Sequence, residues 1–121
     1  MSIKFTIVNQ KNYLKVKASG KDDNLEEVFH YANSILKEAS KNKSKRILSD
    51  ERELVYEIST LDTFTLAEEA AKHCRHLMKI AIVCNSRYLE EGKFYETVAS
   101  NRGLIVRVTD NYDEAEKWLL K

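Results

Sequence analysis

Lys79-Ile-Ala-Ile-Val-Cys84 and Leu104-Ile-Val-Arg-Val108 decide the fold, and both lie in the last third of the chain. Each stretch is short and rich in β-branched residues, which is typical of a buried strand. A segment with helical spacing separates them, and another follows, beginning at Asn111 and closing with Trp118-Leu119. This alternation predicts parallel strands joined by helical crossovers, with residues 80–83 as the central strand.

The helical segment between these strands begins at Ser86 and extends to about residue 99. We expect an interruption near Gly92, because glycine is a poor helix former. Gly103 follows the segment and is suited to the left-handed conformation that often ends a helix. The sequence therefore predicts a broken helix with a glycine stop.

The first 20 residues predict an antiparallel hairpin. Apolar and polar residues alternate in residues 3–9 and again in residues 13–19, and a short polar turn at residues 10–12 links the two runs. Such alternation is typical of strands with one wet face. We expect Gly20 to break the second strand.

The longest amphipathic pattern begins after this hairpin. Residues 23–26 resemble a capping box, and apolar residues follow at helical spacing up to Ala39. Residues 46–50 predict a strand, and residues 51–59 predict an extended segment or a further strand. A helix over residues 63–76 follows, preceded by candidate N-cap oxygens. The fold class is therefore α/β, a mixed sheet in which an N-terminal antiparallel hairpin precedes βαβα units.

Composition restricts the classes of function. The 121 residues fit a single domain over residues 1–121, and a formal net charge of +1 gives no general attraction to nucleic acid or anionic membranes. No secretory signal is visible at the N-terminus, and no run approaches the about 20 apolar residues that cross a bilayer. Two cysteines suit a reducing compartment. We therefore expect a cytoplasmic protein that neither binds nucleic acid nor inserts into membranes.

The three glycines are far apart in the sequence. Loops that cradle phosphate groups need clustered glycine, so the common nucleotide-binding loops are excluded and no cofactor is expected.

The whole pattern resembles the STAS superfamily of anti-sigma-factor-antagonist-like domains, and within it the SpoIIAA-like bacterial branch. The similarity is carried by 79–83, Phe94, 102–108, Asp113-Glu-Ala115 and Trp118-Leu119. The resemblance implies a non-enzymatic regulatory domain that binds a protein partner, with a homodimer as a further option. It also implies a phosphorylation switch in some members, at an Asp-Ser-Ser-Gly-like sequence that begins the second helix.

Asp62 and Thr63 match the aspartate and hydroxyl of that sequence, whereas the second serine and the glycine are absent. A phosphate there is favoured by free N–H groups and the positive helix end. The alternative is that Ser59, Thr60, Asp62 and Thr63 only cap the helix. Asp62 and Thr63 are thus the candidate phosphosite or anion-binding helix start.

Other chemistry-bearing residues predict packing rather than catalysis. His73, Cys74 and His76 do not converge as zinc requires, and Cys84 ends a buried strand, so no metal site is expected. The carboxylate pairs Asp22/Asp23, Glu68/Glu69 and Glu90/Glu91 are expected at helix starts or on solvated faces, where pKa values stay ordinary. We therefore expect no catalytic residues and no enzyme activity.

Tyr88 and Tyr95 are candidates for a groove at the carboxyl ends of the strands, where open sheets bind partners or ligands. The alternative places Phe94 in the core and both tyrosines at its rim. The leading hypothesis for function is a regulatory or protein-binding domain. The alternative is a small-molecule or lipid-binding domain with an apolar pocket between sheet and helices, and an uncharacterised enzyme is a third.

Overall fold

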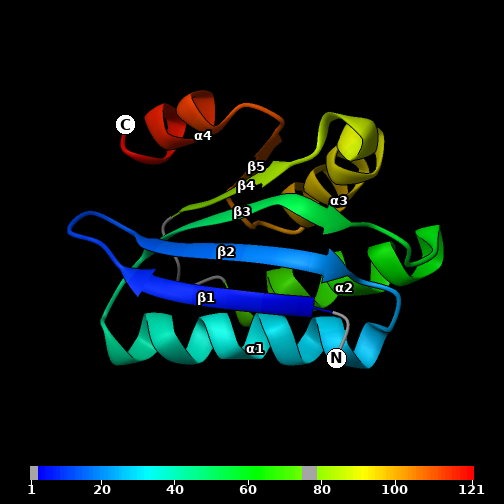
Figure 1. Cartoon of the computed structure of the whole chain (residues 1–121), viewed down its shortest axis with the longest axis horizontal. Coiled ribbons are helices and arrows are strands. Elements are labelled where there is room, and N and C mark those ends of the chain that lie inside the picture. The colour runs from blue at the N-terminus through cyan, green and yellow to red at the C-terminus, as the bar shows by residue number, and fades with distance from the viewer. Residues whose placement is uncertain (1–2, 75–78) are drawn as a thin grey trace.

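The computed structural model describes residues 3–74 and 79–121. A five-stranded sheet lies at its centre, with the strands in the order β1-β2-β3-β4-β5. Figure 1 shows the sheet with its helices. The strands are β1 (Ile3–Asn9), β2 (Leu14–Lys21), β3 (Arg46–Val55), β4 (Lys79–Cys84) and β5 (Val106–Thr109). β1 and β2 pair antiparallel and the other neighbours pair parallel, so the predicted mixed sheet with an opening hairpin is confirmed.

Two details of the strands differ from the prediction. Gly20 lies inside β2 with a φ of 104°, so it does not break the strand but continues it in a conformation that favours glycine. The central strand of the sheet is β3 rather than β4, because the hairpin strands β1 and β2 lie on one side of β3 and β4 and β5 on the other. β3 also continues to Val55 and so includes most of the segment whose structure was ambiguous.

The described residues contain four α-helices and one short 3₁₀ turn, of which the last helix follows the last strand and the others lie between strands. These elements are α1 (Leu25–Lys41), α2 (Thr60–His73), η1 (Ser86–Tyr88), α3 (Leu89–Asn101) and α4 (Tyr112–Leu119). Asn24, Ser59 and Asn111 are the N-caps of α1, α2 and α4, and each side chain accepts a hydrogen bond from a backbone N–H in the first turn. None of the helices in the described part of the chain is both long and apolar enough to span a membrane.

The start of α2 and the course of α3 correct two predictions. α2 begins at Thr60, three residues before the expected start, and the expected end at His76 lies outside the described residues. α3 continues through Gly92 without a break. Gly92 faces β5 so closely that an added Cβ would lie 2.6 Å from Cγ1 of Val108, so this glycine allows close packing. Gly103, with a φ of 95°, follows the helix as predicted.

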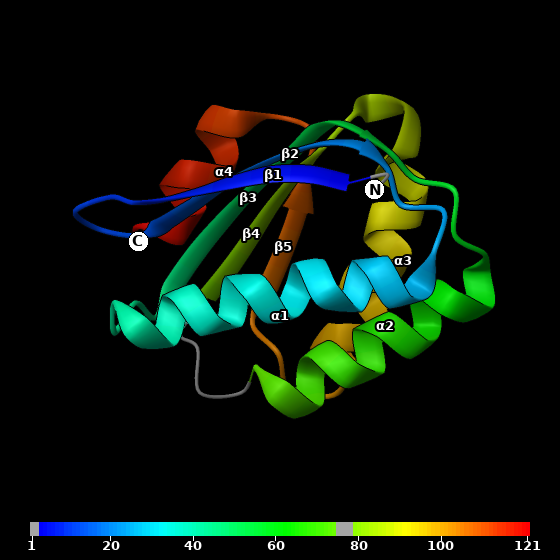
Figure 2. The ribbon, with the colours of Figure 1, turned by 60° about the horizontal axis from the view of Figure 1, so that its bottom comes forward.

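The helices cover the two faces of the sheet unequally. Figure 2 shows α1, α2 and α3 together on one face and α4 on the other. The larger core lies under α1, α2 and α3, and it includes Val16, Tyr31, Ala67 and Ala99. The smaller core joins Leu48 and Val83 of the sheet to Ala115 and Leu119 of α4. The larger core also encloses a cavity between the sheet and these three helices.

Candidate functional site

A cavity of about 170 Å³ lies between the sheet and helices α1, α2 and α3. Its lining is largely apolar and includes Val28, Leu54, Leu66 and Ile82. Asp22, Glu51 and Tyr56 also line it: Asp22 directly follows β2, Glu51 lies within β3 opposite the last residue of β4, and Tyr56 follows β3. An enclosed apolar space with a few polar groups is the usual form of a ligand site, so this cavity is the candidate binding site.

Glu51 is the buried acid of this cavity. The Tyr31 hydroxyl of α1 donates a hydrogen bond to Oε2 at 2.9 Å, and the Tyr56 hydroxyl donates to Oε1 at 2.5 Å. Each carboxylate oxygen is therefore held by a tyrosine from a different part of the chain. We refer to Glu51, Tyr31 and Tyr56 as the Glu51 cluster.

An irregularity in β3 gives Glu51 its direction. Lys17 of β2 pairs with Asp50, and Ser19 pairs with Glu53, so β3 contains one more residue than β2 across this step. Such a bulge re-aims side chains beside functional sites. Ile47, Ser49 and Glu51 line the cavity before the extra residue, and Leu54 and Tyr56 line it afterwards. The bulge thus brings Glu51 and Tyr56 to the same cavity although they are an odd number of residues apart.

Burial dominates the electrostatics of Glu51. Desolvation raises the pKa of its carboxyl from 4.5 to about 7, while the hydrogen bonds from Tyr56 and Tyr31 act in the opposite direction. The negative charges of Asp22 and Asp50 raise the pKa further. Burial also raises the pKa of both tyrosines well above 10, so they remain hydrogen-bond donors at neutral pH.

Asp22 is a second buried acid, at the end of the paired strand. Its Oδ1 accepts a hydrogen bond from the backbone N–H of Glu57 at 2.5 Å and so fastens the loop that follows β3. Burial raises the pKa of Asp22 to about 6, against the lowering effect of the backbone hydrogen bonds. The prediction that the Asp22/Asp23 pair lies on a solvated face is therefore wrong for Asp22, because the β2–β3 pairing encloses it.

The two cysteines are free and buried. Burial raises the pKa of both Cys74 and Cys84 to about 11, so neither thiol forms an appreciable thiolate at neutral pH. Cys74 lines the cavity and Cys84 pairs with Glu51 in the β3–β4 register. Their role is packing, as their sequence context predicts.

The predicted pair Asp62-Thr63 lies in the first turns of α2. The hydroxyl of Thr63 donates a hydrogen bond to the backbone oxygen of Ser59 at 3.0 Å, and the Ser59 hydroxyl accepts from the N–H of Asp62 at 3.1 Å. Ser59 is thus the capping residue, and Thr63 is one turn inside the helix and lines the cavity. Phosphorylation of this turn stays a prediction.

Tyr88 and Tyr95 occupy different places. Tyr95 of α3 lines the cavity, and burial raises the pKa of its hydroxyl. Tyr88 of η1 is half-buried and lies against Tyr56, with 5.4 Å between the ring centroids. The structure therefore connects both to the cavity, Tyr95 directly and Tyr88 through Tyr56. Phe94 is exposed rather than part of the core.

The candidate metal ligands do not come together in the part of the chain that is described. Residues 3–74 and 79–121 contain no group of three or more His, Cys, Asp or Glu side chains that could hold a metal ion. His73 instead lies 3.3 Å from Glu69, measured from Nε2 to Oε2, and His76 lies outside the described residues.

Sequence reasoning did not find the Glu51 cluster. Ser49 and Glu51 share the spacing of two that continues the buried face from Ile47, and this was the available signal. A charged residue in an ambiguous extended segment is usually on the solvated face, and the bulge that places Tyr56 beside Glu51 has no glycine to mark it. The role of Tyr31 could not be predicted, because the sequence of a helix does not show which residue of the sheet each of its side chains contacts.

Comparisons with known proteins identify the fold. Neither a scan of protein-family models nor a search of the curated proteins finds a match. Among solved structures, the chain is similar to an uncharacterized protein of the DUF3478 family with a SpoIIAA-like fold from Shewanella loihica PV-4. The alignment covers 98% of this chain and 94% of that chain, with 19% sequence identity and a TM-score of 0.56. The chain therefore has a SpoIIAA-like fold, which confirms the predicted α/β architecture and the resemblance to STAS-like domains.

Proposed function

We propose that this protein is a non-catalytic binding domain that takes up a small, largely apolar molecule in the cavity beneath α1, α2 and α3. The observation that carries the proposal is a space of about 170 Å³ between the sheet and three helices, apolar in most of its lining, with the hydrogen-bonded Glu51 cluster as part of that lining. Pockets with an apolar wall and few polar groups are the usual form of ligand sites.

The size of the cavity favours a small molecule over a lipid. An apolar protein cavity of about 150 Å³ accommodates benzene. The space here is similar, so it accommodates a single ring or a short branched chain. A phospholipid with two acyl chains is far larger than this space. Of the two ligand classes that the sequence left open, the small molecule is therefore the better fit.

The side chains of the cavity support binding rather than catalysis. Cys74 is the thiol in the lining, and burial raises its pKa to about 11, which removes it as a nucleophile at neutral pH. Both oxygens of Glu51 already accept hydrogen bonds from tyrosines, which orients the carboxyl group. This arrangement suits recognition of a polar group at the end of an apolar ligand.

Native mass spectrometry of protein freshly purified from its own host tests the proposal. We expect a species heavier than the polypeptide by a small mass that disappears when the protein is denatured. A polypeptide without added mass, co-purifying with another protein, would support the regulatory alternative.

Regulation through a protein partner is the second candidate, and one observation favours it. Leu61, in the first turn of α2, is 73% exposed beside Asp62 and Thr63, so a partner that bound this turn would also remove the leucine side chain from water. Leu66 and Ala70 of the same helix line the cavity. α2 therefore has an exposed first turn and also forms part of the cavity wall. Intact-mass measurement of protein from its host tests the switch: absence of a phosphorylated fraction under all growth conditions counts against it.

A further inference from the structure

The lining of the cavity is acidic as well as apolar. Asp22, Glu51, Glu69 and Glu91 line it. Among the described lining residues there is no lysine or arginine, and the basic group is the imidazole of His73, which lies 3.3 Å from Glu69. An anionic ligand would meet carboxylates at several points of this wall without a cationic partner. The charge of the lining therefore selects against anions.

The hydrogen-bond donors of the Glu51 cluster are already engaged. The hydroxyl protons of Tyr31 and Tyr56 both point at the Glu51 carboxylate, so neither is available to a ligand carboxylate or phosphate. A carboxylate oxygen has more than one lone pair, however, and Glu51 can accept a further hydrogen bond on each oxygen. A ligand group that binds Glu51 must therefore be a hydrogen-bond donor.

Resting on the proposed function, we infer that the ligand carries a protonated amine, which Glu51 binds as its ion-pair and hydrogen-bond partner at the polar end of the cavity. The apolar remainder of the ligand occupies the space lined by Val28, Leu66 and Ile82. A buried carboxylate is costly without a cation, and a cation is costly in an apolar cavity without a carboxylate, so each offsets the desolvation of the other.

Aromatic rings around the cluster support a cation in the same place. Tyr31, Tyr56 and Tyr95 all line the cavity, and the electron-rich faces of tyrosine rings attract ammonium groups. Recognition of amines commonly combines a carboxylate with such rings. The three tyrosines therefore favour an amine over a neutral hydroxyl compound of the same size.

Binding of an amine is coupled to the ionisation of Glu51. Burial holds the pKa of Glu51 near 7 in the free protein, and a bound cation stabilises the charged form. Alkylamines stay protonated well above this range, as lysine does with a pKa of about 10.4. The titratable groups around Glu51 are Tyr31 of α1, Asp22 at the end of β2, Tyr56 after β3, Cys84 of β4 and Tyr95 of α3, and the charge of Asp50 acts on it from the opposite face of β3. Of these, Asp22 has a raised pKa of about 6 and charges before Glu51 does, so its charge also favours the cation as pH rises.

Calorimetric titration with three compounds tests the inference: benzylamine, benzyl alcohol and benzoate share one benzene ring and differ in their polar group. Each has a ring of the size that the cavity accommodates. One unit above the Glu51 pKa, we expect benzylamine to bind at least about tenfold more tightly than benzyl alcohol, and benzoate to bind weakest. Below that pKa, we expect benzylamine binding to weaken by up to about tenfold per pH unit, because Glu51 must lose its proton on binding.

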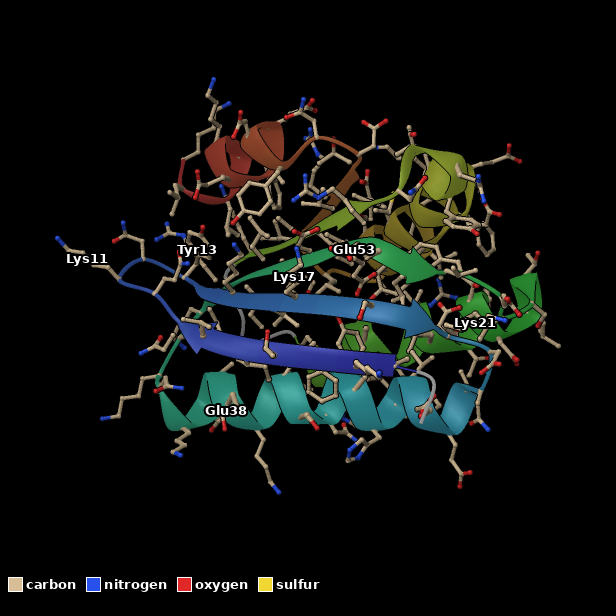
Figure 3. The ribbon with its side chains drawn as sticks, viewed as in Figure 1. Lys11, Tyr13, Lys17, Lys21, Glu38 and Glu53 are labelled. Carbon is tan, nitrogen blue, oxygen red and sulfur yellow. The ribbon has the colours of Figure 1, made fainter. Side chains whose placement is uncertain are left out.

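Glu51→Gln is the decisive variant, and Glu53→Gln is its matched control. Glu53 lies two residues away on β3, and its Oε2 is 3.1 Å from Nζ of Lys17. Figure 3 shows Glu53 and Lys17 on the side of the sheet away from α1, whereas Glu51 lines the cavity on the side of α1. We expect Glu51→Gln to remove the preference for benzylamine and its pH dependence, and Glu53→Gln to retain both. If Glu51→Gln does not fold, Tyr56→Phe keeps the carboxylate but removes a donor that lowers its pKa, so the pH midpoint of binding should move upward.

The outcomes separate the inference from the function on which it rests. Benzyl alcohol binding as tightly as benzylamine, or a preference that survives in Glu51→Gln, overturns the amine but leaves a small-molecule cavity. Tightest binding of benzoate likewise overturns it. If none of the three probes binds, the proposed function fails and the inference fails with it.

Discussion

The burial of the Glu51 side chain makes the stability of the folded protein depend on pH. In the unfolded chain its carboxyl has an ordinary pKa of 4.5, whereas burial raises it to about 7 in the folded protein. Between these values the folded protein holds a proton that the unfolded chain releases. The stability that Glu51 contributes by keeping its proton in the folded protein is therefore present in full below pH 4.5, and it is lost as pH rises through about 7.

We predict that Glu51→Gln flattens the decline in stability over this window. In the parent protein, the free energy of unfolding should fall by on the order of 3 kcal/mol from Glu51 as pH rises, since one pKa unit corresponds to about 1.4 kcal/mol. Urea unfolding at a series of pH values measures the effect. Asp22 contributes in the same direction at lower pH, because its pKa rises from 3.8 to about 6, and the variant should retain this part. A parallel decline in the variant and the parent across neutral pH contradicts the prediction.

The roles of individual residues could be predicted from the sequence where neighbouring residues determine them. Cys84 at the end of an apolar run and Gly103 after a helix were both understood correctly, because burial in a strand and a positive φ leave marks within a few residues. Glu51 left no such mark. Its burial depends on Tyr31, 20 residues away, and on a bulge in β3, so its role follows from tertiary structure.

At the scale of elements, Gly92 shows that a glycine in a helical pattern is compatible either with a break in the helix or with close packing of an unbroken helix. The sequence predicted a broken helix, but α3 continues and Gly92 instead permits its close approach to β5. Both outcomes are common for glycine in a helical pattern. The contact that decides between them is with Val108, which lies on a different element.

We predict that Gly92→Ala destabilises the protein despite the better helix propensity of alanine. The new Cβ would lie 2.6 Å from Cγ1 of Val108, so α3 and β5 must separate, and overpacking of this kind costs about 1–3 kcal/mol. Chemical denaturation measures the loss. Adding Val108→Ala should make the effect of Gly92→Ala smaller than it is in the parent background, because it removes the clashing methyl group.

Gly103→Ala is the matched control for this experiment. Gly103 has a φ of 95° and nothing within 4 Å of an added Cβ, so its substitution costs backbone strain rather than a clash. We expect its loss of stability to be unchanged by Val108→Ala. Equal effects of Val108→Ala on both glycine variants would show that the clash at Gly92 does not determine its cost.

At the scale of the whole molecule, the mixed sheet with its opening hairpin followed from alternating periodicities, whereas the identity of the central strand and the cavity did not. Each helix and strand carries its own apolar pattern, and the connection rules assemble them into a mixed sheet. Figure 2 shows that α1, α2 and α3 pack together on one face of the sheet. The cavity is the space between these helices and the sheet. Its existence depends on the relative positions of three helices and five strands, which no short stretch of sequence encodes.

Filling the cavity tests whether it is the binding site without changing a polar group. Ala70 of α2 is half-buried and lines the cavity, so Ala70→Leu places a larger apolar side chain in the space. Cavity-filling substitutions commonly add about 0.5–2 kcal/mol of stability. A ligand that binds the folded state also raises the melting temperature, by an amount set by its concentration relative to its Kd. We predict that Ala70→Leu keeps or raises the Tm of the free protein and abolishes the further increase that benzylamine gives.

Lys72→Leu is the control for Ala70→Leu, because Lys72 is exposed on the same helix and receives an equally apolar side chain outside the cavity. We expect this variant to retain the ligand-dependent rise in Tm. Retention of that rise in Ala70→Leu would place the ligand on the outer surface, where the exposed first turn of α2 becomes the site to test. Loss of the rise in Ala70→Leu alone means that the interior of this SpoIIAA-like fold is the binding surface, because the two variants share a helix and differ in the side of it that they alter.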